Sequence, residues 1–345
     1  MTLRDRVCQR RNRLRNRFPK ATLADVAERA GVSPSTASRA LNGHSGLAAA
    51  TRAAVQDAAA SLNFQPSPLA RSLRMQQTFT VGFVVPDVSS PFYAAALKGA
   101  QRRLEQAGYR VMLMDASLDV ERELAALETL RAHQVDGLLV STAGSSRDDF
   151  HDAVGPTPTV FFDSVVDDAG HGAVLLDNAR GTELLVQHLV EHGHERIALL
   201  AGSQRETSGF ERLDAFLAAR PDAERYVKVC AWSIDEGRRA GLELLADPEP
   251  PTAVVASSVE LALGFMTAAG ERGLGIPADV ALASFDDPYF GDLLEPPLTA
   301  VAYDPCVVGE RAADLLVGAL RAGGEPKEVR VPVTLVTRRS CGCDG

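Results

Sequence analysis

The sequence contains no long apolar run and little cysteine. None of its apolar stretches reaches the roughly 18–20 residues that a bilayer-spanning helix needs. The charged N-terminus lacks the apolar core of a secretory signal peptide. The five cysteines are odd in number and scattered, unlike the even framework of a disulfide-stapled domain. These absences predict a cytoplasmic protein with reduced thiols and no membrane partner.

Catalytic and metal-binding motifs are also missing. The sequence has neither a G-x-S-x-G nucleophile elbow nor a phosphate-binding loop. The stretch "GLGIPA", residues 273–278, mimics a dinucleotide fingerprint but lies after a helical pattern and before a strand pattern, the reverse of the required order. His188 and His192 have a metal-compatible spacing and Cys341 and Cys343 form a C-x-C, but neither pair has further ligands beside it in the sequence. The sequence therefore predicts that the protein is not an enzyme and holds no cofactor or metal.

Charge is distributed unevenly along the 345 residues. The formal net charge is −9, but residues 1–77 contain 13 Lys/Arg against 4 Asp/Glu, whereas the remainder contains 23 against 41. A basic head on an acidic body suggests a polyanion-binding module joined to a different unit. Residues 1–20 alone hold eight of the basic residues. They are either a disordered extension that binds nucleic acid non-specifically or the product of a misplaced start codon.

Three short helical patterns follow this basic stretch. In the first, Thr22 is a good N-cap residue whose capping-box partner is Asp25, and Gly31 ends the helix. The third pattern covers residues 51–62. Asn63 follows it and is one of the few non-glycine residue types that tolerate a left-handed backbone. Such short, punctuated helices are typical of a small all-α domain.

The second helical pattern has the features of a DNA-recognition helix. Ser33 caps it, Pro34 occupies its first position, and it runs to about Asn42. Its small hydroxyl side chains allow close approach to DNA, and Arg39 can reach a phosphate or a guanine edge. With the glycine turn before it, this pattern predicts a helix-turn-helix whose second helix enters the major groove. An ordinary serine-rich surface helix is the alternative.

The pattern changes from residue 79 onward. Nine nearly continuous apolar runs, such as "TVGFVV" and "DVALASF", alternate with amphipathic helical patterns. This alternation is typical of parallel strands that are covered on both faces in an α/β fold. More than 250 residues is long for one such sheet, so we expect two lobes.

Polar side chains follow several of these predicted strands. Ligands of open α/β sheets bind beyond the carboxyl ends of the strands, and these ends hold Ser141, Asp163, Ser257, Ser258 and Asp286. Carboxylates at two strand ends can each accept hydrogen bonds from sugar hydroxyls. Helix capping or a salt bridge between lobes is the alternative role for the two aspartates.

Four segments together resemble the LacI-type family of bacterial transcription regulators. They are "TLADVAERAGVSPSTASRALNG", "PSPLARSLR", "LLDNARGTELLVQHLVEHGHERIALLAG", and "PPLTAVAYDPCVVGERAADLL" with the closing "PVTLVTRRS". The resemblance covers nearly the whole chain from about Thr22 to Ser340. It implies an all-α helix-turn-helix head at 21–64, a hinge-helix linker at 65–78, and an effector-binding core at 79–340.

The resemblance further implies that this core is an α/β periplasmic-binding-protein-like fold of two Rossmann-like lobes joined by three crossovers. We expect the crossovers near Ser164, Pro288 and Gly323. The predicted first lobe then contains about 79–163 and 289–323, and the predicted second lobe contains about 165–288 and 324–340.

The resemblance also implies which residues contact DNA. Pro34, Ser35 and Arg39 match the base-reading positions of the family. Leu69, with Ala70 beside it, matches the wedge of the hinge helix, which kinks the duplex by entering a minor-groove base step. The predicted DNA-contacting residues are Thr22, Ser33, Pro34, Ser35, Thr36, Ser38, Arg39, Asn42, Leu69, Ala70 and Arg71.

For the effector, the resemblance adds Phe92, Arg212 and Trp232 to the strand-end residues. Trp232 is the only tryptophan, and an indole face suits a pyranose ring, although a surface aromatic is the alternative. Val259 follows Ser258 where the family often has an acid, which changes the expected effector geometry there. The predicted effector-binding residues are Phe92, Ser141, Asp163, Arg212, Trp232, Ser258 and Asp286.

These observations predict a sequence-specific DNA-binding regulator, most simply a repressor. We expect a homodimer on a double-stranded operator, controlled by a small effector of the sugar or polyol class. The end of the sequence lacks the leucine heptads that make tetramers of some family members. The alternative is a solute-binding protein or sugar enzyme with the same core, which leaves the basic head unexplained. The sequence leaves open whether the effector releases DNA or promotes its binding.

Overall fold

The computed structural model describes residues 21–41, 46–64, 77–166, 170–322 and 327–343. The chain divides into two units, Met1–Thr78 and Phe79–Gly345. The basic extension, most of the predicted hinge-helix linker and four predicted DNA contacts lie outside the described residues. Those four contacts are Asn42, Leu69, Ala70 and Arg71.

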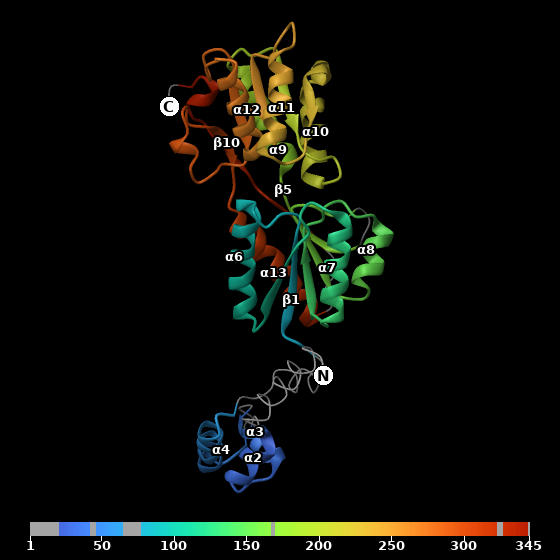
Figure 1. The fold of residues 1–345 in the computed structure, drawn as a ribbon, viewed down its shortest axis with the longest axis vertical. Coiled ribbons are helices and arrows are strands. Elements are labelled where there is room, and N and C mark those ends of the chain that lie inside the picture. The colour runs from blue at the N-terminus through green and yellow to red at the C-terminus, as the bar shows by residue number, and fades with distance from the viewer. Residues whose placement is uncertain (1–20, 42–45, 65–76, 167–169, 323–326, 344–345) are drawn as a thin grey trace, which may run out of the picture. The chain divides into compact units, whose positions relative to one another are not determined.

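The described residues of the first unit form three helices, which Figure 1 labels. They are α2 (Leu23–Arg29), α3 (Pro34–Leu41) and α4 (Ala49–Ser61). Small apolar side chains from all three form its core, which contains Val26, Ala27, Ala37, Ala40, Val55, Ala58 and Ala59. Small residues allow the three short helices to approach one another closely.

The predicted boundaries of the first helix are confirmed. The Thr22 N–H donates to the Asp25 carboxylate at 2.7 Å and the Asp25 N–H donates to Thr22 Oγ1 at 3.3 Å, which completes the capping box. Gly31 then takes a left-handed conformation with φ of 65°, which ends the helix. Asn63 has φ of 49° after the third helix, as its residue type predicts.

In the second unit the described residues form two six-stranded sheets, each the centre of one lobe (Figure 1). The first sheet is wholly parallel in the order β11-β5-β4-β3-β1-β2. Its strands are β1 (Thr80–Val85), β2 (Arg110–Asp115), β3 (Gly137–Val140), β4 (Thr159–Phe162), β5 (Gly172–Leu176) and β11 (Glu328–Val331). Its helices are α6 (Pro91–Gln106), α7 (Val120–Ala132), α8 (Arg147–Val154) and α13 (Pro305–Ala322).

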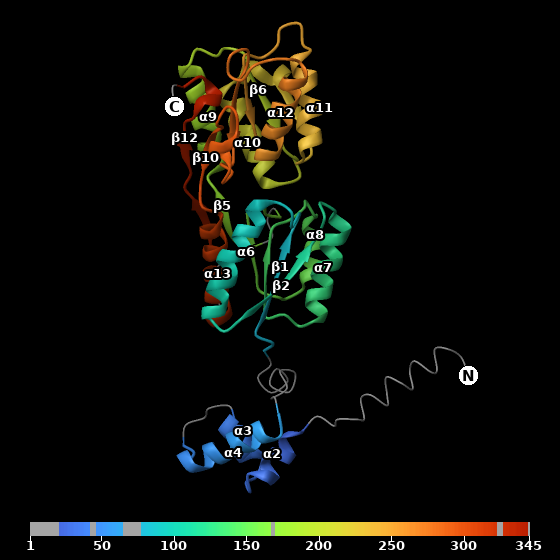
Figure 2. The same cartoon turned by 60° about the vertical axis from the view of Figure 1, so that its left-hand side comes forward.

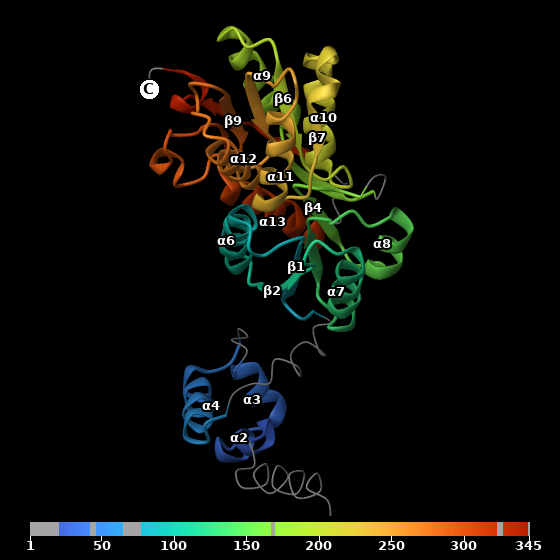
Figure 3. The same ribbon diagram turned by 45° about the horizontal axis from the view of Figure 1, so that its top comes forward.

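The second sheet has the order β12-β10-β9-β8-β6-β7, parallel except for β12. Its strands are β6 (Ile197–Ala201), β7 (Val227–Val229), β8 (Ala253–Ala256), β9 (Ala281–Phe285), β10 (Thr299–Ala302) and β12 (Thr334–Val336). Its α-helices, seen in Figure 3, are α9 (Asn178–Glu191), α10 (Thr207–Ala219), α11 (Ile234–Leu245) and α12 (Val259–Glu271). Short 3₁₀ helices are η1 (Pro221–Tyr226), η2 (Gly291–Leu293) and η3 (Arg339–Cys341).

Helices cover both faces of each sheet (Figure 2). In the first lobe, α6 and α13 contribute to the core on one face and α7 and α8 to the core on the other. In the second lobe, α9 and α10 share one face and α11 and α12 the other. Because successive strand residues point to opposite faces, double coverage explains why the strands are apolar throughout. Among the described residues, no helix has the length and apolarity needed to cross a bilayer.

The first two crossovers between the lobes differ from the prediction. Because β5 belongs to the first sheet, the first crossing follows Leu176 instead of Ser164. Because β10 belongs to the second sheet, the second crossing follows Ala302 instead of Pro288. In both cases the lobe takes one more strand before the chain leaves it.

The third crossover is also later than predicted. The chain adds β11 to the first sheet and β12 to the second, so the crossing lies between Val331 and Thr334 rather than at Gly323. The first lobe therefore contains residues 79–176 and 303–331, and the second contains the rest of this unit. A continuously apolar strand does not encode which of two similar sheets it joins, which is why the sequence misplaced all three crossings.

Candidate functional site

The exposed face of α3 presents polar side chains to solvent. Ser35 and Arg39 are both exposed and lie four residues apart, so they share one face of the helix. Ser33 Oγ accepts from the Thr36 N–H at 3.2 Å, and it lies 2.8 Å from Ser35 Oγ and 2.9 Å from Thr36 Oγ1. Three hydroxyls thus gather at the start of α3, next to the exposed Pro34.

Two predicted DNA contacts have other roles in this unit. Ser38 is only 9% exposed and lies on α3 between the core residues Ala37 and Ala40, so it offers DNA little surface, and its DNA contact stays a prediction. A helix advances about 100° per residue, which turns positions 37 and 40 inward when 35 and 39 face outward and leaves position 38 on the flank, about 60° from position 35. Thr22 is exposed, and its side chain is engaged in the capping box.

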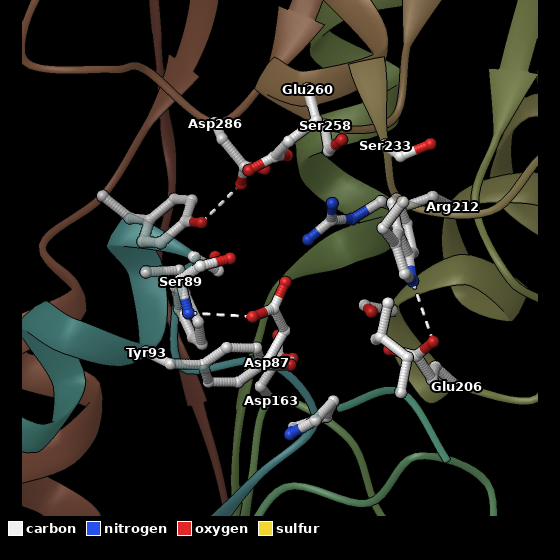
Figure 4. A pocket seen from close by; sticks show the side chains of 17 residues that line it. Asp87, Ser89, Tyr93, Asp163, Glu206, Arg212, Ser233, Ser258, Glu260 and Asp286 are labelled. Atoms are coloured by element: carbon white, nitrogen blue, oxygen red, sulfur yellow. Dashed lines mark hydrogen bonds between the residues drawn. The ribbon is translucent and has the colours of Figure 1, made fainter. Parts of the chain in front are cut away.

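A cleft of about 330 Å³ separates the two lobes of the second unit (Figure 4). It is bordered by the carboxyl ends of strands from both sheets, as the strand-end rule predicts. Six of the seven predicted effector residues line it: Phe92, Asp163, Arg212, Trp232, Ser258 and Asp286. The seventh, Ser141, is fully buried behind the cleft, where its Oγ lies 3.3 Å from the Tyr93 hydroxyl.

Asp163 and Asp286 occupy equivalent positions in the two lobes. Each follows a strand directly, β4 and β9 respectively, and each has a left-handed backbone, with φ of 62° and 79°. The Tyr93 hydroxyl donates to Asp163 Oδ2 at 2.9 Å, and the Tyr303 hydroxyl donates to Asp286 Oδ1. Such backbone strain is typical of functional sites, and the tyrosines fix the orientation of both carboxylates.

Arg212, which carries the positive charge of the cleft, is held in place by several contacts. It lies on α10 and is only 4% exposed. Its Nε donates to Asn178 Oδ1 at 2.9 Å and a terminal nitrogen donates to the Ser257 carbonyl. The guanidinium carbon lies 3.6 Å from the centroid of the Phe285 ring. These contacts aim the guanidinium group into the cleft (Figure 4).

Trp232 is fixed from two sides. Its indole N–H donates to Glu206 Oε1 at 2.8 Å. Its ring lies against Gly202, where an added Cβ would come within 1.7 Å of a ring atom. Glycine at 202 is therefore required for this ring position, and Ser233, the next residue, caps α11.

The cleft is acidic. Burial raises the pKa of Asp163 to about 6, against the opposing charge of Arg212, and raises the pKa of Glu206 to about 7, against the hydrogen bond from Trp232. Among the described residues that line the cleft, Arg212 alone is basic. The five acids are Asp87, Asp163, Glu206, Glu260 and Asp286. This charge balance disfavours an anionic ligand.

Known proteins match both units. The family described as "Bacterial regulatory proteins, lacI family" matches residues 22–67, and the "Periplasmic binding protein-like domain" matches residues 186–341. The ribose operon repressor of Escherichia coli K12 is 33% identical over 305 residues, which cover 86% of this chain and 92% of that protein. The chain belongs to the LacI family. The repressor PurR of Actinobacillus pleuropneumoniae serotype 3 is 32% identical and covers 93% of this chain and 98% of its own length.

A solved structure agrees with this assignment. The lac repressor dimer bound to operator and the anti-inducer ONPF has a TM-score of 0.85 and 30% identity, covering 93% of this chain and 99% of its own. The predicted fold class, a helix-turn-helix head with a periplasmic-binding-protein-like core, is confirmed. As a LacI-family member, the chain is a DNA-binding transcriptional regulator and not an enzyme.

Several residues of the cleft were missed in the sequence. Tyr93 follows β1 in the segment "PDVSSPFY", Glu206 follows β6, and Tyr303 follows β10. The strand-end rule would have found Tyr303, which follows β10 directly, but not Tyr93 on α6 or Glu206, which lies several residues beyond β6. The cleft residues not predicted are Pro86, Asp87, Ser89, Ser90, Tyr93, Leu118, Glu206, Ser208, Ser233, Glu260 and Tyr303.

Proposed function

We propose that this LacI-family regulator is a repressor whose operator affinity is set by a neutral small molecule of the sugar or polyol class. The observation that carries the proposal is the lining of the cleft, where carboxylates at two strand ends and an indole ring border one space (Figure 4). A carboxylate accepts hydrogen bonds from several hydroxyls at once. An indole ring offers flat apolar surface to the C–H face of a sugar ring.

The proposed ligand contacts both lobes. Tyr93 and Asp163 belong to the first lobe, whereas Arg212, Trp232 and Asp286 belong to the second. A ligand that bridges the lobes favours the arrangement in which all these contacts are made. It shifts the equilibrium between arrangements only by its difference in affinity for them. That difference is the proposed source of control over DNA binding.

On the DNA side, the proposal assigns base reading to the exposed face of α3. Ser35 and Arg39 project from it, and the cluster of hydroxyls at its first turn suits a phosphate. Pro34 lies between Ser33 and Ser35 at the start of the helix, where we propose that it leaves room for close approach of the DNA.

We further place a homodimer contact on the first lobe. β2 is the edge strand of the first sheet, and its Leu113 is 38% exposed. Leu97, Tyr109 and Val111 lie beside Leu113 on the same groove. An apolar edge of this kind is a liability for a monomer unless another chain covers it.

A two-stage experiment tests the proposal. Full-length protein is first screened by thermal shift against neutral sugars, polyols and their phosphorylated forms, because a ligand at a hundred times its Kd adds about 2.7 kcal/mol of stability. Ligands found in this way are then added to a band-shift titration with a duplex selected from a random library. We expect a neutral sugar or polyol to stabilise the protein and to change its DNA affinity at least tenfold. Preference for the phosphorylated forms, or ligand binding without any change in DNA affinity, contradicts the proposal.

A further inference from the structure

Four residues with metal-ligating side chains meet where the last described residues pack against α9. His188 lies in the last turn of α9 and His192 is its C-cap. Cys341 ends η3, and Cys343 follows two residues later. In the sequence these are two separate pairs, 149 residues apart at their nearest, and each was set aside for lack of further ligands. The fold brings the two pairs together, because β12 returns to the second sheet beside α9 and carries the two cysteines with it.

Three of the four side chains, His188, Cys341 and Cys343, hold their ligand atoms as close as a single ion requires. Cys341 Sγ lies 3.1 Å from His188 Nε2 and 3.3 Å from Cys343 Sγ. Cys343 Sγ lies 3.4 Å from His188 Nε2 and 3.2 Å from His192 Nε2. Ligands held at 2.0–2.3 Å from a tetrahedral zinc ion lie roughly 3.3–3.8 Å from one another. Small outward movements of the sulfurs therefore create the space for the ion.

The histidines present the correct ring atoms. The Nδ1 of His192 lies 2.8 Å from the backbone carbonyl of His188, a contact that a ring N–H makes as donor. The proton is then on Nδ1, which leaves the lone pair of Nε2 directed toward Cys343 Sγ. A backbone carbonyl that fixes the tautomer in this way is a regular feature of metal-ligating histidine.

The surroundings fit a closed structural site rather than an open catalytic one. Cys341 is 1% exposed and His188 is 9% exposed, and Cys343 is half-buried. The ligand atoms of His188, Cys341 and Cys343 all lie within 4.8 Å of one another. His192 is exposed and adjoins this group only at Cys343, so its ring must move inward to complete the site. Two thiolates and two imidazoles are a donor set that zinc prefers, and they leave no position for a reacting water.

We propose that His188, His192, Cys341 and Cys343 bind one zinc ion, which fastens the C-terminal segment to α9 of the second lobe. Neither the DNA-reading head nor the effector cleft contains any of these residues, so the proposal is independent of the proposed function. Cys341 Sγ also lies 3.0 Å from Thr299 Oγ1 and 3.2 Å from the Arg338 carbonyl. A purely hydrogen-bonded thiol cluster is therefore the competing explanation, and a Cys341–Cys343 disulfide is another.

The test uses full-length protein, reduced with a phosphine, freed of metal by a chelator and titrated with Co²⁺ and then Zn²⁺. We expect one Co²⁺ per chain, with thiolate-to-cobalt charge-transfer absorption and the d–d bands of a tetrahedral ion. Zn²⁺ should displace the Co²⁺ and raise the thermal unfolding midpoint, because an ion that binds only the folded state stabilises it.

Matched variants identify the ligands. His192→Ala replaces an exposed side chain and Cys343→Ser a half-buried one. Each should lower Zn²⁺ affinity at least tenfold, because mutation of even a residue that only supports a metal ligand causes a loss of about this size. His133→Ala is the matched histidine control, because His133 caps α7 and its Nδ1 makes the same contact, 2.8 Å from the Thr129 carbonyl. Cys306→Ser is the thiol control, and both controls should bind like the wild type.

Three results would overturn the proposal. They are the absence of stoichiometric cobalt with a thiolate band in the reduced wild type, equal Zn²⁺ affinity in all four variants, and a Cys341–Cys343 disulfide that persists under the phosphine.

Discussion

Trp232 is held in one orientation by its hydrogen bond to Glu206 and by its contact with Gly202. Because this orientation is already fixed, a ligand that stacks on the ring loses little freedom there. We expect Trp232→Ala to weaken effector binding about ten- to a hundredfold, or about 1.4–2.8 kcal/mol, as measured by calorimetry. DNA affinity without effector should stay the same.

The control for this substitution is Tyr289→Ala. Tyr289 is 92% exposed and does not line the cleft, so its removal tests only the loss of an aromatic side chain. Equal effector affinity in the Trp232→Ala variant and the wild type would remove the indole from the proposed binding surface.

Glu206 makes the stability of the folded chain depend on pH. Burial raises its pKa to about 7 from an ordinary value of 4.5, so between these pH values the folded state holds a proton that the unfolded state has lost. Its contribution to stability is fully present below pH 4.5 and is lost as pH rises through 7. Asp163, with a pKa raised to about 6, acts in the same direction over a lower range.

Replacing Glu206 by glutamine removes this titration. The free energy of unfolding of the wild type should decrease as pH rises from about 5 to about 8. We expect this decrease to be roughly 1–3 kcal/mol smaller in Glu206→Gln. Denaturant unfolding at a series of pH values measures this difference. Parallel curves for the two proteins would show that the carboxyl group is ionised in the folded state throughout this range.

Among the elements of the head, α3 is the helix that we propose reads the DNA sequence. Arg39→Ala should weaken binding to the selected operator by about 1–3 kcal/mol and relax the preference for the base it contacts. Arg29→Ala is the control, because Arg29 is an exposed arginine in the last turn of α2 and carries the same charge. Band-shift titrations at fixed salt compare them, and equal losses would mean that Arg39 contributes charge alone.

The sequence predicted the elements better than their assignment to sheets. Nine strands and the three head helices follow from local patterns, since capping residues and apolar runs act over a few residues. The crossovers after Leu176, Ala302 and Val331 were misplaced because either sheet can cover an apolar strand. The short strands β7 and β11 have partly exposed residues and did not stand out from their surroundings.

Candidate site residues were predictable where a strand ends and a family pattern exists. Asp163 and Asp286 follow their strands directly, so one rule places both in the cleft. The low exposure of Ser38 was not foreseen, because hydroxyl content does not tell which side of a helix faces inward. The cluster of His188, Cys341 and their neighbours was not predictable, since its two halves meet only after the whole second sheet has formed.

For the whole molecule, we expect tight operator binding to require two chains. Leu113→Glu places a charge on the exposed edge strand β2, where burial against a second chain would leave it unpaired. We expect this variant to be a monomer by analytical ultracentrifugation and to lose at least tenfold in operator affinity.

The control is Val229→Glu. Val229 is 52% exposed on β7, the edge strand of the other sheet, which the account leaves free. This variant should remain a dimer, and a dimeric Leu113→Glu protein would place the contact between chains elsewhere.

The central claim is that a ligand in the cleft controls DNA binding by the head. Its most direct test is the operator affinity of the full-length protein, measured at one salt concentration with and without a saturating neutral sugar that binds at one molecule per chain. We expect at least a tenfold change in affinity, and in Trp232→Ala the same change should need about ten to a hundred times more ligand. An operator affinity that stays the same while the cleft is occupied would contradict it.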